Sequence, residues 1–255
     1  MKRFNVAGKC VWLTGASSGI GEALVFELAA RGARVAITAR RGDVLESIKA
    51  KIPSAHGEVR CFPGDVCELT QMKEIVARVE REMGPIDLAI PNAGTHVFTV
   101  PEAFNSDEYL SLMQLNFGGM LRCIEAVLPG MLGRGRGYLA PVASLAGYRG
   151  LPRAAAYGAS KAAMIHFLES IRFHLKTKGI TISIVNPGFV KTPLTDKNDF
   201  RMPFLVDAQQ AAKIICDGIA RRKREIAFPF PFNWVLKIAR MLPDPVYEKI
   251  VDRCW

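Results

Sequence analysis

Histidine and cysteine are scarce in the sequence, and neither is spaced as a metal site requires. The chain holds four histidines and six cysteines, with no Cys-x-x-Cys pair and no close Cys/His set. Structural zinc sites usually draw their ligands from closely spaced pairs, so we predict no bound metal. Scattered cysteines also argue against a disulfide framework and favour reduced thiols.

Long apolar runs are absent as well. The chain starts MKRFNVAGKCVWLTG, and the apolar run in this stretch is too short for the core of a signal peptide. No later segment reaches the length that spans a bilayer without including charged residues. Together with the reduced thiols, these absences predict a cytoplasmic protein.

Acidic residues are outnumbered: 24 Asp and Glu stand against 34 Lys and Arg, which gives a net charge of +10. Such a charge favours an anionic partner, for example a phosphorylated cofactor, a membrane surface or nucleic acid. The basic residues are spread along the chain, without a nucleic-acid recognition motif or interleaved aromatic residues. We therefore predict no nucleic-acid partner, and charge alone does not choose between the other two.

Short apolar segments alternate with longer segments of helical periodicity over most of the chain. The expected strands are Val11–Thr14, Arg34–Ala39, Glu58–Phe62, Ile86–Pro91, Gly137–Ala143, Thr181–Asn186 and Glu225–Phe228. The expected helices are Gly19–Arg31, Asp43–Lys51, Glu68–Met83, Asn105–Leu132, Ala155–Lys178 and Asp207–Arg222. This alternation is typical of a doubly wound α/β domain, in which a parallel sheet carries helices on both faces. We assign residues 1–228 to this domain and residues 229–255 to a C-terminal helical extension.

The turn between the first strand and the first helix is rich in glycine and serine. It supplies Gly15, Ser17, Ser18, Gly19, Ile20 and Gly21. Glycines let the backbone approach a pyrophosphate closely, and the helix that follows presents free N–H groups to the phosphates. The spacing Gly-x-x-x-Gly-x-Gly differs from the commoner Gly-x-Gly-x-x-Gly, but a doubly wound fold binds a dinucleotide at this turn.

Two arginines, Arg40 and Arg41, follow the second expected strand, and no acidic residue stands at its end. An NAD site usually has an acidic residue here to bind the ribose 2′-hydroxyl, whereas an arginine accommodates the 2′-phosphate of NADP. The arginines could also merely begin a solvated helix. We favour the phosphate role and predict that NADP(H) is preferred over NAD(H).

Tyr157 and Lys161 are four residues apart in a helical segment, so both side chains lie on one face, about one turn apart. A free tyrosine has a pKa of about 10 and is a poor base at neutral pH, but a nearby cation lowers that pKa. The pair can therefore act in acid/base catalysis. Ser144, thirteen residues before Tyr157, could hydrogen-bond the same substrate oxygen.

The sequence resembles the short-chain dehydrogenase/reductase family from its start to about Phe228. The matching motifs, in the family's order and spacing, are Thr14–Gly21, Asp65-Val66, Asn92-Ala93-Gly94, Asn116, Ser144, Tyr157 with Lys161, and Pro187-Gly188 with Thr192. The resemblance implies a Rossmann-like fold with seven parallel strands. It also implies a homo-oligomer, a dimer or tetramer built through the helices expected at Asn105–Leu132 and Ala155–Lys178.

The resemblance further implies a role for each matching residue. Tyr157 would donate or accept the proton, and Ser144 would orient the substrate carbonyl. Lys161 would lower the tyrosine pKa and bind the nicotinamide ribose, while Asn116 would hold a water in a proton relay. The other implied cofactor contacts are Asp65 and Val66 at the adenine, Asn92, Ala93 and Gly94 at the cofactor-binding strand, and Pro187, Gly188, Val190 and Thr192 at the nicotinamide end.

These residues predict an NADP(H)-dependent oxidoreductase that transfers a hydride between the nicotinamide and a carbonyl or alcohol. The alternative is a dinucleotide sensor without catalysis, but a sensor has no need for all four residues implied in catalysis. Apolar side chains are frequent in the segment Thr192–Leu205, where the family carries its substrate loop. Leu145, Tyr148, Leu151, His96 and Phe98 are possible neighbours of this segment. A mostly apolar pocket of this kind favours a lipophilic aldehyde, ketone or secondary alcohol.

The segment after Phe228 is not explained by the resemblance. Apolar residues at helical spacing share one face of it, namely Trp234, Val235, Ile238, Met241 and Leu242, while Lys237 and Arg240 fall off that face. A basic amphipathic helix can lie in a membrane interface, pack across the substrate pocket or pack against a second subunit. Docking onto protein is the favoured interpretation, and peripheral membrane contact is the alternative.

Overall fold

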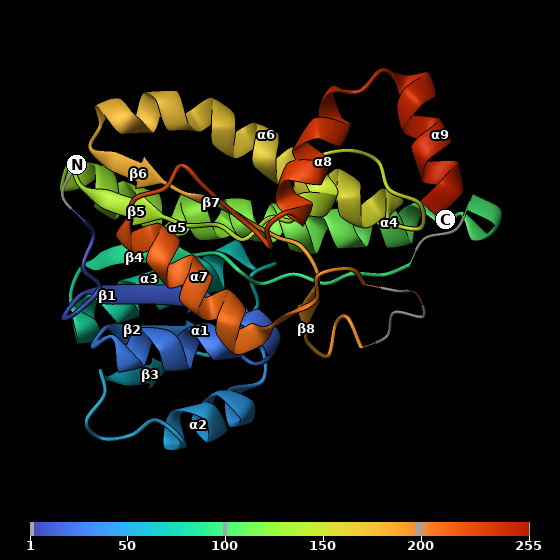
Figure 1. The fold of residues 1–255 in the computed structure, drawn as a ribbon. Helices are drawn as coiled ribbons and strands as arrows, with labels where there is room; N and C mark the ends of the chain where they lie inside the picture. Colours follow the sequence, from blue (N-terminus) through green and yellow to red (C-terminus); the bar gives the residue numbers. More distant parts are fainter. Residues whose placement is uncertain (1–2, 99–100, 197–199, 201, 255) are drawn as a thin grey trace.

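A parallel sheet lies between two layers of helices in the computed structural model, which describes residues 3–98, 101–196, 200 and 202–254 (Figure 1). The sheet has six strands in the order β3-β2-β1-β4-β5-β6. Their bounds are β1 Cys10–Thr14, β2 Arg34–Thr38, β3 Val59–Cys61, β4 Ile86–Ile90, β5 Gly137–Leu139 and β6 Ile180–Ile182. The strand order reverses between β1 and β4, and a doubly wound sheet binds its ligand at such a switch point.

Both faces of the sheet are buried, as parallel sheets require. Side chains alternate along β1, so Val11 and Leu13 join one apolar cluster and Cys10 and Trp12 join the other. The first cluster is shared with α1 (Gly19–Ala30), α2 (Gly42–Ala50) and α7 (Ala208–Ala220). The second is shared with α3 (Leu69–Met83), α5 (Gly119–Gly133) and α6 (Ala155–Thr177).

The sheet is one strand shorter than expected, so the prediction of seven strands in one sheet was wrong. The expected strand Thr181–Asn186 is divided at Ser183 into β6 and β7 (Ile184–Pro187), and β7 pairs with β10 (Glu225–Phe228) in a separate two-stranded sheet. Pro141 accounts for the break. A regular ladder would need an N–H from residue 141 to the Ser183 carbonyl, and proline has none. Pairing resumes only where the Val185 N–H donates to the Pro141 carbonyl at 3.0 Å.

The helix expected over Asn105–Leu132 is interrupted. It consists of α4 (Ser106–Met113), a π-helical turn η2 (Gln114–Gly118) and α5. Single π turns inside α-helices occur frequently at functional sites, and this one carries Asn116. The remaining short elements are the 3-10 turns η1 (Pro101–Ala103) and η3 (Leu145–Gly147) and the paired strands β8 (Val190–Lys191) and β9 (Val206–Asp207).

Two further helices, α8 (Phe232–Met241) and α9 (Asp244–Cys254), form the C-terminal extension. They lie at the end of the molecule where α6 begins (Figure 1). Among the helices of the described residues, none is both long enough and apolar enough to cross a membrane. The division of the chain between residues 228 and 229 stays a prediction.

Candidate active site

A cleft with a volume of about 490 Å³ lies at the carboxyl ends of the strands. Every residue predicted to contact the cofactor lines it, and so does Ser144. The cleft also includes residues that the sequence motifs did not single out, namely Ala39, Gly64, Thr95, Leu115, Val142, Ala143, Pro193, Leu194 and Thr195. Most of these are next to a motif residue in the sequence, and that adjacency is the signal that could have found them.

The turn after β1 fits a pyrophosphate because it has no side chains where the backbone must pass. Gly15 has a φ of +67°, and a Cβ there would lie 2.6 Å from the Ala93 Cα. A Cβ on Gly21 would lie 2.0 Å from the Gly15 carbonyl oxygen. Ser18 precedes α1 without a side-chain cap, so the first N–H groups of the helix are not bonded by it and can face an anion.

Arg40 and Arg41 are both exposed at the rim of this cleft. Nη2 of Arg41 donates to Oγ of Ser17 at 3.0 Å and to the Ser17 carbonyl at 3.4 Å. The guanidinium therefore lies beside the phosphate turn, where it could pair with a phosphate on the adenine ribose.

Asn92 joins the end of β4 to the phosphate turn. Its Nδ2 donates to the carbonyl oxygens of Thr14 and Gly15, both at 3.1 Å, and its backbone N–H donates to Oγ1 of Thr14 at 3.2 Å. Both amide hydrogens of the side chain are thus used to hold the turn. This geometry suits the positioning role that the resemblance implies.

The hydroxyl groups of Ser144 and Tyr157 interact at the centre of the site. Burial raises the pKa of the Tyr157 hydroxyl, and the hydrogen bond with Ser144 offsets part of that rise. Oγ of Ser144 also lies 3.3 Å from the Pro187 carbonyl, to which it can donate. Tyr157 is therefore a protonated phenol at neutral pH in this arrangement.

The role expected for Lys161, lowering the pKa of Tyr157, stays a prediction, because burial is the largest influence on the pKa of the phenol. Nζ of Lys161 donates to the Val142 carbonyl at 3.0 Å and lies 5.6 Å from the centre of the Tyr157 ring. Burial lowers the pKa of Lys161 itself to about 8. Desolvation is the largest influence on the pKa of both groups, and the lysine is almost fully buried.

Asn116 lies behind the cleft instead of lining it, and it is fully buried. Its Oδ1 accepts from the Thr95 N–H at 2.8 Å, and its Nδ2 donates to the Thr95 carbonyl and to Oγ of Ser160, both at 3.0 Å. A Cβ on Gly94 would lie 3.0 Å from Asn116 Oδ1 and 3.6 Å from Lys161 Nζ. Asn116 is thus close to Lys161, and its role in a proton relay stays a prediction.

A second cavity, of about 120 Å³, adjoins the cleft at Ser144, Tyr157 and Gly188. The predicted pocket residues His96, Phe98, Leu145, Leu151, Leu194 and Phe200 line it. Tyr148 does not line it, because its hydroxyl bonds Glu225 instead. The cavity is also lined by Phe189 and, on α8, by Phe232 and Leu236, which the sequence motifs did not single out. The spacing of four between the last two was the available signal.

Aromatic rings and aliphatic side chains together form much of the wall of this cavity. His96 stands edge-on to Tyr157, with ring centroids 4.9 Å apart, and burial lowers the His96 pKa, which favours a neutral ring. Phe189 lies between Phe200 and Phe232, with centroid distances of 5.9 and 5.8 Å. Residues 197–199 and 201 of the expected substrate loop lie outside the described residues. The described wall suits an apolar ligand whose polar atom reaches Tyr157.

Comparisons with known proteins agree with this geometry. The short chain dehydrogenase family model matches residues 9–201. An uncharacterized oxidoreductase of Myxococcus xanthus is 36% identical over 241 residues, which cover 94% of this chain and 95% of that protein. The 11-beta-hydroxysteroid dehydrogenase-like 2 of Arabidopsis thaliana is 32% identical and covers 95% of this chain and 80% of its own. A fatty acyl-CoA reductase of Acinetobacter baylyi is 31% identical, and the match covers 88% of this chain and 77% of that protein.

A solved structure shares the fold. The short chain dehydrogenase/reductase of Burkholderia phymatum, in complex with NAD, superimposes with a TM-score of 0.85 over 93% of this chain and 95% of that chain, at 21% identity. The family model covers most of the sequence, and the relatives extend over nearly all of it. The chain therefore belongs to the short-chain dehydrogenase/reductase family of oxidoreductases, which use a nicotinamide dinucleotide.

Proposed function

We propose that this protein is an NADP(H)-dependent oxidoreductase that reduces a lipophilic aldehyde or ketone, or oxidises the matching alcohol. One observation carries the proposal: the dinucleotide cleft and the aromatic cavity meet at Ser144, Tyr157 and Gly188. A substrate in the cavity would present its oxygen to the two hydroxyl groups. The bound nicotinamide supplies or accepts the hydride at the same junction.

Proton transfer is assigned to Tyr157. Its raised pKa keeps the phenol protonated at neutral pH, so it can donate a proton to the oxyanion that develops during reduction. Ser144 donates a hydrogen bond to the same oxygen and favours the charge that forms there. Lys161, charged below about pH 8, places a cation on the side of the phenol away from the substrate cavity, where it would hold the nicotinamide ribose. A protonated Tyr157 beside a charged Lys161 favours reduction of the carbonyl over oxidation of the alcohol.

The preference for NADP(H) is supported by Arg40 and Arg41. Arg41 already bonds the phosphate turn through Ser17, and both guanidinium groups are exposed to the cleft. A 2′-phosphate placed between them would accept charge-assisted hydrogen bonds, each of which contributes roughly 1.5–3 kcal/mol. The NAD in the Burkholderia phymatum structure belongs to that protein, whose identity to this chain is only 21%.

A lipophilic substrate is supported by the cavity wall and by the names of two relatives. Phe98, Phe189, Phe200 and Phe232 face the cavity, and His96 is its neutral polar neighbour. The names of the Arabidopsis and Acinetobacter relatives refer to a steroid and to a fatty acyl group. Both are large apolar molecules, although neither is assigned to this chain.

The alternative of a sensor without catalysis is less well supported. Binding of a dinucleotide does not require a hydroxyl pair at the mouth of a second cavity, yet Ser144 and Tyr157 both lie there. A cytoplasmic location stays a prediction.

The test is cofactor binding followed by turnover. NADPH and NADH are titrated by fluorescence, and apolar aldehydes and ketones are then screened by nicotinamide absorbance. We expect NADPH to bind at least about tenfold more tightly than NADH and some apolar carbonyl to be reduced. Binding of neither cofactor would remove the basis of the proposal, and equal use of both would remove the NADP preference.

Homo-oligomer formation is part of the proposal. Large apolar side chains are exposed on the elements that would form the interface: Leu110 on α4, Leu132 on α5 and Phe173 on α6. Light scattering after gel filtration is expected to give a dimer or tetramer, and a monomer at micromolar concentration would contradict this.

We also propose that the outer face of α8 contacts a lipid surface. Trp234, Val235, Ile238 and Met241 are exposed, with 57% of Trp234 and 84% of Met241 accessible. The charged residue of α8 that is exposed, Arg240, is basic, which suits anionic lipid. We expect the protein to sediment with vesicles that contain anionic lipid, and the Trp234→Ser, Ile238→Ser variant to stay in solution. Equal partitioning of both proteins would dismiss the contact.

A further inference from the structure

The polar residues that follow the catalytic serine turn toward the C-terminal extension. Tyr148 and Arg149 come directly after η3, and the hydroxyl of Tyr148 donates to Oε1 of Glu225. Nη1 of Arg149 donates to the carbonyls of Ala239 at 2.7 Å and Leu242 at 2.6 Å, at the end of α8. The segment after Ser144 thus contacts the end of α8 through Arg149 and contacts β10 through Tyr148.

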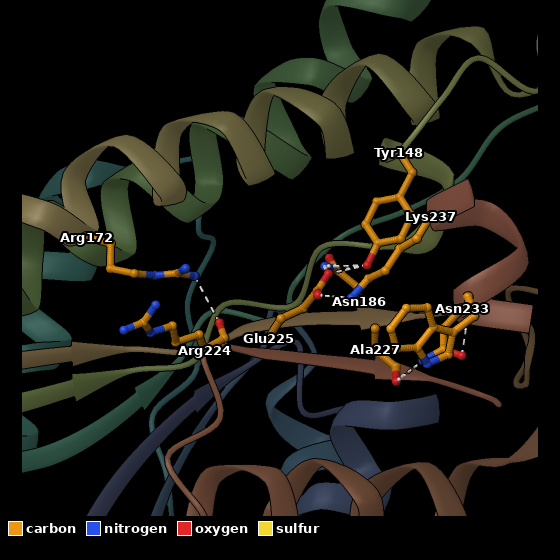
Figure 2. A network of polar contacts seen from close by, with 9 residues as sticks. Tyr148, Arg172, Asn186, Arg224, Glu225, Ala227, Asn233 and Lys237 are labelled. Atoms are coloured by element: carbon orange, nitrogen blue, oxygen red, sulfur yellow. Dashed lines mark hydrogen bonds and ion pairs between the residues drawn. The ribbon is translucent and has the colours of Figure 1, made fainter. Parts of the chain in front are cut away.

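Glu225 is the centre of a network of polar contacts that includes Tyr148 (Figure 2). Its Oε1 accepts from Tyr148 and from Nδ2 of Asn186 at 2.9 Å, while its Oε2 accepts from Nζ of Lys237. One carboxylate therefore joins β10, β7, the segment after η3 and α8. Burial raises the pKa of this carboxyl, but the hydrogen bonds from Lys237, Tyr148 and Asn186 outweigh burial, so the net pKa lies below its ordinary value.

Two residues of α8 line the substrate cavity, and each directly precedes a residue of α8 that forms a polar contact with another segment. Phe232 precedes Asn233, whose Nδ2 donates to the Ala227 carbonyl at 3.1 Å, and Leu236 precedes Lys237 (Figure 2). The packing beneath Phe232 is close, because a Cβ on Gly188 would lie 3.2 Å from Phe232 Cδ1.

Apolar burial alone holds α8 weakly. The structure describes all ten residues of this helix, and none is fully buried. An element with few buried apolar contacts opens easily unless polar contacts hold it. A hydrogen bond to a charged group is stronger than one between neutral groups, so the contacts of Glu225 can decide where the helix lies.

We propose that Tyr148, Asn186, Glu225 and Lys237 form a latch, the α8 latch, and that Glu225 is a positioning residue that sets the fit of the aromatic cavity around a lipophilic substrate. This proposal rests on the proposed function, because it assigns the cavity to the substrate. Glu225 lines neither the cofactor cleft nor the aromatic cavity. It acts through Lys237, which fixes the neighbouring Leu236 and, with it, the wall that α8 supplies.

Glu225→Gln tests the latch, because it keeps the size of the side chain and removes the charge that holds Lys237. We expect the KM for a long apolar aldehyde to rise about tenfold. The kcat for a short aldehyde, which does not reach α8, and the Kd for NADPH are expected to change less than about twofold. Lys237→Met should repeat this pattern, and Lys237→Arg, which keeps the ion pair, should restore most of the lost affinity.

Glu248→Gln is the matched control, because it removes a carboxylate from the exposed surface of α9. It should leave all these constants unchanged. An unchanged KM for the long aldehyde in Glu225→Gln and Lys237→Met would overturn the latch. So would an equal loss with both aldehydes, which would indicate a general effect on the fold.

Hydrogen exchange separates failure of the latch from failure of the proposed function, because it does not depend on turnover. In Glu225→Gln the amides of Phe232–Met241 should exchange at least about tenfold faster, while those of α1 are unchanged. Unchanged exchange in α8 would overturn the latch even in an active enzyme. Faster exchange confined to α8 would support it even if no carbonyl is turned over.

Discussion

Tyr157 and Lys161 lie one helical turn apart on α6, with the lysine Nζ 5.6 Å from the centre of the phenol ring. Burial acts on the two groups in opposite directions, since it raises the pKa of the tyrosine and lowers that of the lysine to about 8. At neutral pH the pair is therefore a protonated phenol beside a charged ammonium. This is the form that donates a proton to a carbonyl oxygen.

Carbonyl reduction is consequently expected to be favoured at lower pH. Lys161 is charged below its pKa of about 8 and loses that charge as the pH rises through this value. We expect kcat/KM for reduction, measured from about pH 6 to about pH 10, to fall above about pH 8, since this ratio reports the ionisation of the free enzyme. A profile that is flat, or that rises over this range, would contradict the assigned states.

Lys161 is also expected to lower the free energy of unfolding, because its charge is buried. Its pKa lies at about 8 in the folded protein against an ordinary value of 10.5, so between these values the unfolded chain binds more protons. The cost is complete below about pH 8 and is relieved as the pH rises toward the higher value. We expect Lys161→Met to increase the free energy of unfolding at neutral pH by about 1–3 kcal/mol. In this variant the Val142 carbonyl loses its hydrogen-bond donor, which reduces the gain in stability. We therefore expect a value near the lower end of this range.

Urea unfolding of both proteins at neutral pH and at about pH 10 measures this effect. The advantage of the variant should shrink at the higher pH. A variant that is less stable than the parent at neutral pH would show that the hydrogen bond to Val142 outweighs the burial of the charge.

The sequence predicts the cofactor side of the molecule better than the substrate side. Gly15 and Asn92 lie at turns and strand ends, where few kinds of side chain fit. Tyr157 and Lys161 share one face of a helix because they are four residues apart. Both patterns can be recognised in the sequence alone. The strand break at Ser183 depends on Pro141, which is forty-two residues earlier, and only pairing reveals it. Likewise Phe232 and Leu236 line the cavity because Glu225 and Arg149 hold α8 from other segments.

The same limit explains the outer face of α8. The apolar stripe of Trp234, Val235, Ile238 and Met241 predicts a buried face, yet these side chains are exposed in the single chain. The face that turns inward carries Phe232 and Leu236 instead. Periodicity identifies a helix with apolar residues, but when such residues occur nearly all round it, tertiary contacts decide which of them are covered.

Cofactor choice should depend on the two arginines after β2. The double variant Arg40→Ala, Arg41→Ala is expected to raise the KM for NADPH about tenfold or more, and to leave the KM for NADH within about twofold. Steady-state rates with both cofactors measure this. The control is Arg81→Ala on α3, a 70% exposed side chain away from the cleft. Equal losses with NADPH and NADH would show that the arginines serve the fold of the turn and not the phosphate.

The phosphate turn should not tolerate a side chain at Gly21. The Cβ of Gly21→Ala would lie 2.0 Å from the Gly15 carbonyl oxygen, so the turn must shift. We expect the Kd for NADPH to rise at least about tenfold and the free energy of unfolding to fall by about 1–3 kcal/mol. Gly133→Ala is the matched control, because a Cβ at this helical glycine meets nothing within 4 Å. The control should bind NADPH normally, and unchanged binding by Gly21→Ala would refute the close approach.

The central claim is that Tyr157 performs proton transfer where the cofactor cleft meets the aromatic cavity. Single-turnover reduction of an apolar aldehyde by Tyr157→Phe, compared with the parent protein, tests it most directly. The account predicts an unchanged Kd for NADPH, within about twofold, and a rate reduced by roughly a hundredfold to ten thousandfold. Turnover close to that of the parent would contradict it.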